Sequence, residues 1–525
     1  MIRFLYVLMT IFLVGCGFDF DNVVLSDEEI VLEEEIKTTS VLSLSTGTNK
    51  KDDELILSMN TPQTLHPIYN TDETVFQILH LVFDTLVNVE PDGSVSKNIA
   101  EYWTINDDNS ITMVLRSDIF WHDGEPLEAD DVVFSIQTIK YAKSSIYSSN
   151  VANIAYSTVL SPNTVQIYYN QPFSGMLQTL FIPIIPEHIY NVPYAQAINL
   201  DPVGSGAYKF SEHVPLKSLH LEANANYFKG SPNIDKVEIL MTPDHEATLS
   251  AFSQDLIDVI YTEVMDWGKY AKDKSATIYE IPTQKYEFIG VNFNDEILSK
   301  RGVREALISS IDRENLIDIY YLGQGSVADT PISANSYLLD STLESIKYDK
   351  ENARLLLAKE GFEYDETLTF SLLVNKDNAE RLRVAQGIVQ MYDQVGIRLV
   401  LEEVDVTTYM DRIYSGDYQL FLGGWKLSYI PDLTFAFHSS QRYRGDNFIN
   451  YNSDEMDTLL EEAFIAHPND ITTAYSNLQQ FFISEVPYIS LYFKNGALIT
   501  KNRVSGDIDP DPLNIFSNIQ NWKLD

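Results

Sequence analysis

The alternation of hydrophobic and polar positions predicts helices and strands in turn from residue 54 onward. Residues 55–59 have the pattern of a strand, and apolar side chains recur at helical spacing between Val75 and Leu86. Further strands are predicted at 111–115, 164–169, 397–404 and 418–422, and helical segments at 132–139, 303–317, 349–359 and 378–395. Gly361 and Gly396 follow the last two helices, as is typical of C-terminal caps. The pattern favours an α/β protein with several sheets.

The first residues have a different pattern. Residues 4–14 form an almost unbroken apolar run after Arg3, too short to span a membrane but of the length of a signal-peptide core. The run ends in Leu13-Val14-Gly15-Cys16, which looks like a bacterial lipobox, and Cys16 is the only cysteine. We predict a lipoprotein signal peptide over residues 1–15 and lipidation at Cys16. An ordinary signal peptide with an incidental cysteine is the alternative.

Residues 16–50 are acidic and then rich in Ser and Thr, so they form a core poorly and predict a flexible tether. No later stretch of 18 apolar residues occurs. The lipid on Cys16 is therefore the only membrane attachment that we expect, on the outer side of the cytoplasmic membrane, at the cell surface or in the periplasm.

The composition of the chain excludes several classes of function. The chain has 525 residues, 45% of them hydrophobic, which is ample for a buried core. Its net charge is −40, from 36 basic and 76 acidic residues, and such a surface repels the phosphates of nucleic acids. A single cysteine excludes intramolecular disulfides and cysteine-based metal sites. We expect no cofactor and no resident metal.

Catalytic motifs are not found. No two of the nine histidines have the spacing of a zinc-binding helix, and no Walker loop or nucleophile elbow is present. Gly323 to Ala328 fits G-x-G-x-x-A, but the segment follows a predicted helix over 315–322 instead of a strand, so the dinucleotide interpretation fails. We predict that the chain is not an enzyme; a secreted hydrolase would need a nucleophile or a metal that the sequence does not reveal.

Several segments contain recognisable sequence motifs. They include Ile99-Ala100-Glu101-Tyr102-Trp103, then Phe120 to Leu127, then Ala129-Asp130-Asp131-Val132-Val133-Phe134-Ser135, and later Pro202 to Phe210 and Gly302 to Leu307. Together they resemble family 5 of the extracellular solute-binding proteins, the oligopeptide- and dipeptide-binding proteins of ABC importers. The resemblance extends over nearly all of residues 54–525.

The resemblance implies a periplasmic-binding-protein-like fold of type II: two α/β lobes joined by a hinge, with an extra subdomain on lobe I. Carried onto this chain, lobe I takes residues 51–88, 164–290 and 490–525, the extra subdomain 89–163, and lobe II 291–489. A ligand would lie between the closing lobes, and the closed monomer would be recognised by the ABC permease in the membrane.

The resemblance also suggests ligand contacts. Asn70 and Asp72 precede the first long helix, Tyr286 lies on the strand that enters the hinge, and Trp425 follows two glycines in Gly423-Gly424-Trp425. Arg381 lies near the position where dipeptide binders hold the ligand carboxylate. The alternatives are a helix cap for Asp72, core packing for the two aromatic residues, and a surface charge for Arg381.

One departure concerns the ligand's α-ammonium group. Peptide binders carry an aspartate three residues after this tryptophan, whereas this chain has Ser428; Asp432, four residues further on, is a candidate substitute. An arginine of oligopeptide binders is replaced by Leu422, and Lys426 adds a positive charge. Peptides remain the expected ligands. The alternatives are an oligosaccharide, a metal chelate or another small solute, and a signalling or adhesion lipoprotein without transport.

Overall fold

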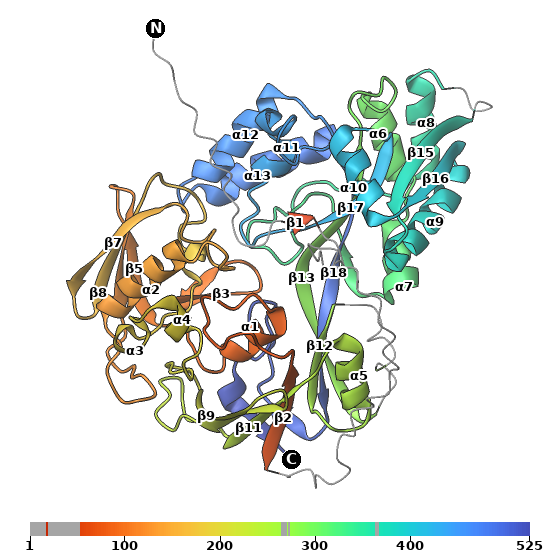
Figure 1. Cartoon of the computed structure of the whole chain (residues 1–525). Coiled ribbons are helices and arrows are strands. Elements are labelled where there is room, and N and C mark those ends of the chain that lie inside the picture. The colour runs from red at the N-terminus through yellow and green to blue at the C-terminus, as the bar shows by residue number, and fades with distance from the viewer. Residues whose placement is uncertain (1–16, 19–52, 264–269, 271–273, 363–366) are drawn as a thin grey trace, which may run out of the picture.

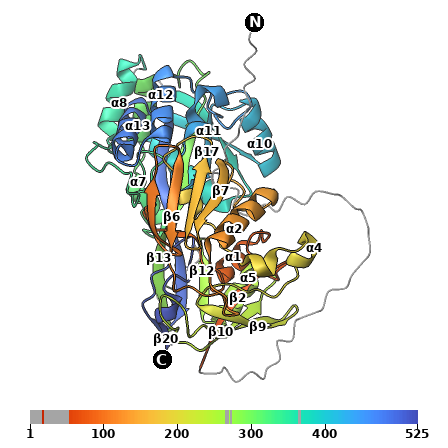
Figure 2. The same ribbon diagram turned by 90° about the vertical axis from the view of Figure 1, so that its left-hand side faces the viewer.

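The computed structural model describes residues 17–18, 53–263, 270, 274–362 and 367–525. The predicted signal peptide, Cys16 and all but two residues of the predicted tether lie outside the described residues. Within them the chain forms two lobes that are connected by two long antiparallel strands (Figures 1 and 2). The predicted α/β class and two-lobed architecture are confirmed, whereas the exact lobe and subdomain boundaries stay predictions.

The first lobe occupies the lower part of Figure 1 and contains two four-stranded sheets. The first sheet has the order β2 (Glu54–Met59), β11 (Lys236–Met241), β10 (Ser218–Ala223) and β9 (Tyr208–Val214). The second is antiparallel, in the order β5 (Ala100–Ile105), β6 (Ser110–Leu115), β8 (Thr164–Tyr169) and β7 (Ile154–Ser161). Two short hairpins are formed by β3 (Val87–Val89) with β4 (Val95–Lys97) and by β19 (Val504–Gly506) with β20 (Trp522–Leu524). One hydrophobic cluster extends through both four-stranded sheets, so they share a core.

The helices of the first lobe are mostly short. They are α1 (Glu73–Leu79), α2 (Ala129–Tyr141), α3 (Glu187–Tyr190), α4 (Tyr194–Ala197) and α5 (His245–Ser253). The longest, α2, buries Val132, Ile136 and Ile139 on one face, which is the spacing that the sequence predicted. Glu128 begins this helix with a capping box, in which its side chain and that of Asp131 each bind the other residue's backbone N–H.

The largest sheet has eight strands and extends from the first lobe into the second. Its main path runs β12 (Val259–Thr262), β18 (Tyr488–Lys501), β13 (Ala276–Val291), β17 (Leu420–Lys426), β15 (Leu368–Asn375) and β16 (Ile397–Val404), and β17, β15 and β16 belong to the second lobe. Two short strands, β1 (Gly17–Phe18) and β14 (Gly325–Val327), pair with β17 and β18. The surrounding helices are α6 (Arg301–Ser309), α7 (Arg313–Tyr321), α8 (Lys350–Lys359), α9 (Ala379–Asp393), α10 (Val406–Ser415), α11 (Thr434–Phe437), α12 (Asp454–Ile465) and α13 (Ile471–Glu485). Two hydrophobic clusters fill this lobe.

Strands β13 and β18 pass from one lobe to the other. Their lower halves pair from Ala276 opposite Lys501, next to β12, and their upper halves pair as far as Gly290 opposite Tyr488, next to β17. The register shifts between Pro282 and Tyr286, so residues 283–285 interrupt the ladder where the strands cross between the lobes. An interrupted ladder bends more easily than a regular one, which places the hinge here.

Most predicted elements match the structure, including β8 and β16 to the residue. Gly361 and Gly396 follow α8 and α9 with φ angles of +96° and +85°, the left-handed conformation that glycine adopts without strain. The apolar pattern from Val75 to Leu86 predicts a longer helix than the structure contains, because α1 ends at Leu79. Beyond it, the carbonyls of Leu81 and Val82 accept backbone hydrogen bonds from Tyr208 and Gly206 instead of continuing the helix.

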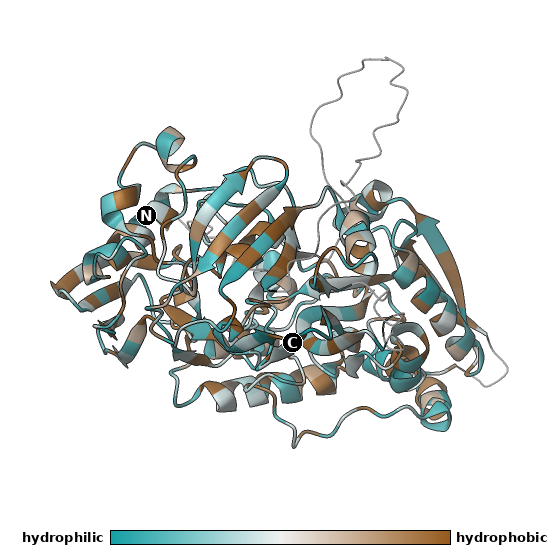
Figure 3. Cartoon of the chain, turned by 90° about the horizontal axis from the view of Figure 1, so that it is seen from below, coloured by the Kyte–Doolittle hydropathy of each residue, from teal (hydrophilic) through white to brown (hydrophobic). Residues whose placement is uncertain are grey.

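Brown and teal positions alternate along most helices and strands in Figure 3, as expected for elements that bury one face. Among the described helices, none combines the length and the apolar character that crossing a membrane requires.

Candidate functional site

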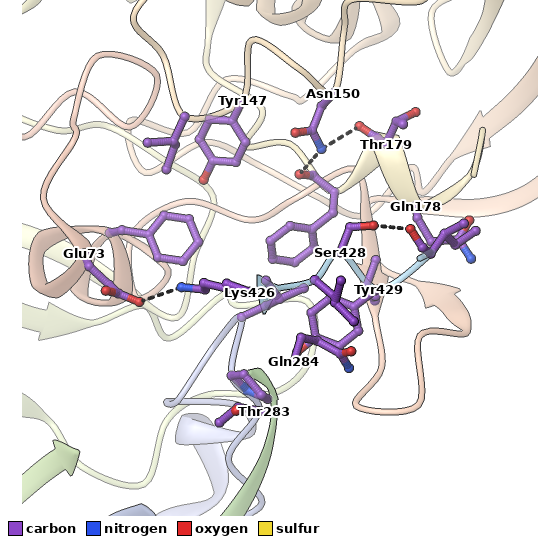
Figure 4. Close-up of a pocket in the computed structure, with 18 of the residues that line it drawn as sticks. Glu73, Tyr147, Asn150, Gln178, Thr179, Thr283, Gln284, Lys426, Ser428 and Tyr429 are labelled. Carbon is purple, nitrogen blue, oxygen red and sulfur yellow. Dashed lines mark hydrogen bonds and ion pairs between the residues drawn. The ribbon is translucent and has the colours of Figure 1, made fainter. Parts of the chain in front are cut away.

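A cavity of about 440 Å³ lies between the two lobes, within the size range of small-ligand pockets. The first lobe contributes the start of α1, Val89 and three loops, the hinge contributes one segment with the nearby Glu263, and the second lobe contributes the end of β17 with the loop that follows it. Apart from Val89 and Glu263, the lining residues fall within 71–77, 146–150, 175–181, 283–285, 426–430 and 512–513. Figure 4 shows Tyr147 and Asn150 on one side, and Lys426, Ser428 and Gln284 on the other.

At the first-lobe wall, Asp72 begins α1. Its Oδ1 accepts hydrogen bonds from the backbone N–H groups of Thr74 (2.8 Å) and Val75 (3.0 Å), and its Oδ2 accepts one from Asn60 Nδ2 (2.8 Å). Burial alone would raise the pKa of Asp72, but these hydrogen bonds hold it below its usual value. The buried Asn70 hydrogen-bonds the backbone of Asp72 with both ends of its amide (2.8 and 3.2 Å) and so fixes this turn.

Two lysines of the lining form ion pairs. Lys426 Nζ lies 3.4 Å from Glu73 Oε1, so this pair joins the second lobe to the first across the cavity (Figure 4). Lys285 Nζ lies 2.9 Å from Glu263 Oε2 at the hinge. Burial would raise the pKa of Glu263, but Lys285 and Lys426 lower it, so this carboxylate stays charged. The cleft thus contains matched charges, with most of its remaining wall apolar.

Ser428 also lines the cavity, and its hydroxyl donates to the carbonyl of Ile430 in its own loop. The neighbouring Tyr429 hydroxyl is buried and has no hydrogen-bond partner among the described residues. Asp432 does not line this cavity. Its Oδ1 accepts a hydrogen bond from Thr434 N (3.0 Å) at the start of α11, and burial raises its pKa.

The other three candidates lie inside the second lobe. Trp425 is 2% exposed and its indole N–H donates to the Tyr488 hydroxyl (3.3 Å). Tyr286 is fully buried, and its hydroxyl shares a hydrogen bond of 2.6 Å with that of Ser490. Arg381 is a buried residue of α9, and its guanidinium lies close to β13 and β17. None of the three lines the cavity.

Arg381 forms a two-pronged pair with Glu287 of β13, its Nε 2.9 Å from Oε2 and its Nη2 2.8 Å from Oε1. A Cβ atom on Gly424 would lie 2.5 Å from Arg381 Nη2 and 2.8 Å from Glu287 Oε1. The glycine before Trp425 therefore leaves room for this ion pair on the strand. This gives the Gly-Gly-Trp motif a role in packing.

Of the seven predicted ligand contacts, the structure brings Asp72 and Ser428 together at the cavity and leaves Asn70, Tyr286, Arg381, Trp425 and Asp432 away from its lining. That any of them contacts a ligand stays a prediction. Sequence reasoning did not single out the first-lobe loops, which supply Tyr147, Asn150, Gln178 and Phe181. These residues belong to no motif, so their position became visible only with the fold.

Strand β15 leaves part of the β17 edge beside the cavity uncovered. Strand β15 pairs with β17 only at Leu420 and Phe421, so the edge of β17 further along is not covered by β15. The chain's own β1 lies antiparallel on that edge, with Gly17 opposite Lys426 and Phe18 opposite Trp425. The edge next to the cavity can therefore accept an extended backbone through main-chain hydrogen bonds.

The lobes also touch outside the hinge. Tyr337 N donates to the carbonyl of Asp92 (3.0 Å), and Ser174 N donates to that of Phe464 (2.7 Å). The rings of Phe173 and Phe464 stack with centroids 5.6 Å apart. These contacts join the first-lobe loops to the second lobe.

Comparison with known proteins supports the geometry. The profile of the bacterial extracellular solute-binding proteins, family 5, matches residues 94–447, about two thirds of the chain. The oligopeptide-binding protein AppA of Bacillus subtilis is 26% identical over 513 residues, covering 91% of this chain and 93% of AppA. The heme-binding protein A of Haemophilus influenzae is 24% identical over 465 residues, covering 81% and 84%. The structure of the ABC transporter substrate-binding protein CtaP from Listeria monocytogenes superposes with a TM-score of 0.76 at 25% identity, covering 90% and 99%.

Proposed function

This chain belongs to the bacterial extracellular solute-binding proteins of family 5, and we propose that it captures peptides between its two lobes and presents them to the permease of an ABC importer. The family acts outside the cytoplasm. The protein binds and releases its solute without changing it chemically, and one copy of the chain suffices, because both walls of the cavity come from the same chain.

The β17 edge that β15 leaves uncovered, and on which β1 lies as an added strand, is the observation that carries the peptide proposal. A peptide has one main-chain donor and one acceptor per residue, and it can satisfy them on a strand edge whatever its side chains are. The position of β1 at Trp425 and Lys426 supports this, because β1 is itself an extended segment next to the cavity. The oligopeptide binder AppA, similar over nearly the whole chain, points the same way.

The lipid anchor is a separate proposal. Cys16 ends the lipobox-like tetrapeptide and lies directly before β1, so a lipid on its thiol would connect the folded part to the membrane. Metabolic labelling with a fatty-acid analogue tests this: we expect label on the natural chain and none on Cys16→Ala. Equal labelling of both chains would contradict the anchor.

Native mass spectrometry of two chains, 17–525 and 53–525, tests the function. We expect co-purified ligands in a ladder of amino-acid masses, because closure slows ligand release. In calorimetry after ligand removal, chain 53–525 should bind short peptides several-fold more tightly, because β1 no longer covers the β17 edge. A single non-peptide mass in both chains, with no calorimetric response to peptides, would overturn the peptide proposal.

A further inference from the structure

The amide of Asn150 hydrogen-bonds through its Nδ2 atom, whereas its Oδ1 atom has no hydrogen-bond partner among the described residues. The residue is 2% exposed, and its Nδ2 donates to the carbonyls of Thr179 (3.0 Å) and Phe181 (3.5 Å). Two carbonyls can only accept, so the NH₂ group must face them and Oδ1 must face away. Among the described residues, Oδ1 has no hydrogen-bond partner. Asn150 lines the cavity between the lobes (Figure 4).

A buried acceptor without a partner is costly, since the oxygen has lost its water. No side chain among the described residues donates a hydrogen bond to Asn150 Oδ1. The rings of Phe76, Tyr147 and Phe181 also line the cavity, and the centroids of the Phe76 and Tyr147 rings lie 6.2 Å apart. The two lysines of the lining form ion pairs elsewhere, Lys285 with Glu263 and Lys426 with Glu73. A ligand that enters the cavity can supply the hydrogen-bond donor that Oδ1 lacks among the described residues.

We propose that Asn150 Oδ1 accepts a hydrogen bond from an N–H or O–H group of the bound ligand, while an apolar part of that ligand packs among Phe76, Tyr147 and Phe181. The inference rests on the proposed function and adds a specificity-determining residue on the first lobe. The donor has two possible sources in a peptide: its main-chain N–H or terminal ammonium, and the tip of a side chain with an apolar body, such as tyrosine.

The chain offers a matched control in Asn98. It is 4% exposed, its Nδ2 donates to the carbonyl of Thr85 (2.8 Å) and to the Thr85 hydroxyl (3.1 Å), and its Oδ1 also has no partner among the described residues. Asn98 does not line the cavity. The same substitution at both positions therefore removes similar packing and hydrogen bonds, and only one of the two faces a ligand.

Calorimetry on the ligand-free protein with three peptide sets tests the proposal. One set exchanges phenylalanine for tyrosine at each position, one methylates each main-chain nitrogen in turn, and one acetylates the terminus. In the natural chain, we expect one donor whose loss weakens binding by about 5- to 150-fold. The set in which that loss occurs identifies the source of the donor.

Asn150→Ala should weaken the best peptide by a similar factor and should no longer discriminate between the paired peptides, whereas Asn98→Ala should bind like the natural chain. Asn150→Ser keeps a hydroxyl donor for Thr179 and replaces Asn150→Ala if that variant fails to fold, as judged by thermal unfolding. If a folded Asn150 variant still distinguishes the paired peptides with and without the donor, the inference about Asn150 is wrong, but the proposed peptide function is unaffected. Binding of no peptide by the natural chain would overturn both.

Discussion

Two ion pairs next to the Gly-Gly-Trp segment contrast in place and exposure. Glu287 and Arg381 lie inside the second lobe, 0% and 3% exposed, and pair through two hydrogen bonds. Glu73 and Lys426 join the two lobes across the cavity at 3.4 Å, 64% and 48% exposed. The first pair cannot separate without exposing the interior of a lobe, whereas the second can open with the cleft. The buried pair serves folding, and the cleft pair serves the opening equilibrium.

The contrast also bears on the predicted ligand contact of Arg381, which stays a prediction. A buried arginine on the helix after Asn378 is a reasonable candidate for a ligand carboxylate, but here a carboxylate of the protein itself already holds its guanidinium. Lys494 lies 3.5 Å from the same Glu287 oxygen, so this carboxylate faces two cations. The charged residues that line the cavity are Asp72, Glu73, Glu263, Lys285 and Lys426, and of these only Asp72 was among the predicted contacts.

The largest effect is expected from breaking the buried pair. Arg381→Met removes the two-pronged partner of the fully buried Glu287, and loss of one partner from a buried pair destabilises proteins by about 3–5 kcal/mol. The urea-unfolding midpoint of the second lobe should therefore fall sharply, while peptide affinity at low urea stays unchanged. Arg383→Met, on the exposed face of the same helix, is the control and should move the midpoint little. Unchanged stability with lost affinity would return Arg381 to the ligand site.

Asp511 extends the comparison of buried and exposed charges. It is a buried carboxylate that, unlike Glu287, has no ion-pair partner among the described residues. Burial, with Glu90 and Asp509 nearby, raises its pKa to about 7 from 3.8. The folded protein therefore binds more protons than the unfolded chain between pH 4 and 7, and stability falls as pH rises through that window. Asp511→Asn should be more stable than the natural chain by about 1–3 kcal/mol at pH 8 and equal to it below pH 3.8.

Thermal unfolding at pH 4, 6 and 8 measures this difference. Asn keeps the oxygen that accepts from Leu513 N (2.6 Å), so the turn itself is preserved. Asp507→Asn, at an exposed carboxylate of the same segment, should show no such pH-dependent gain. A gain at Asp511 that is equal at all three pH values would show that packing, and not the titration of the carboxylate, is responsible.

The sequence predicted many of the elements, the α/β class and the family correctly, because strand and helix periodicity and long motifs are local signals. It was weaker for the cavity, where the lining combines loops around Tyr147 and Phe181 with residues near 284 and 428. Only the tertiary fold brings such segments together. Motif residues such as Trp425 and Arg381 were also ambiguous, since a buried aromatic or charged residue in a motif can support the strand as well as contact a ligand.

The smallest effect is expected at the cleft pair. Glu73→Gln and Lys426→Met should each leave the unfolding midpoint nearly unchanged, because exposed pairs contribute less than about 1 kcal/mol. The effect should appear in closure instead: peptide affinity should fall by less than about fivefold at low salt, and the difference should vanish at 1 M salt, where charges are screened. The double variant should bind peptides as each single variant does, because either substitution alone already removes the pair. A salt-independent coupling as large as that of the buried pair would mean that Lys426 and Glu73 are part of the folded core, and the two pairs would no longer differ in kind.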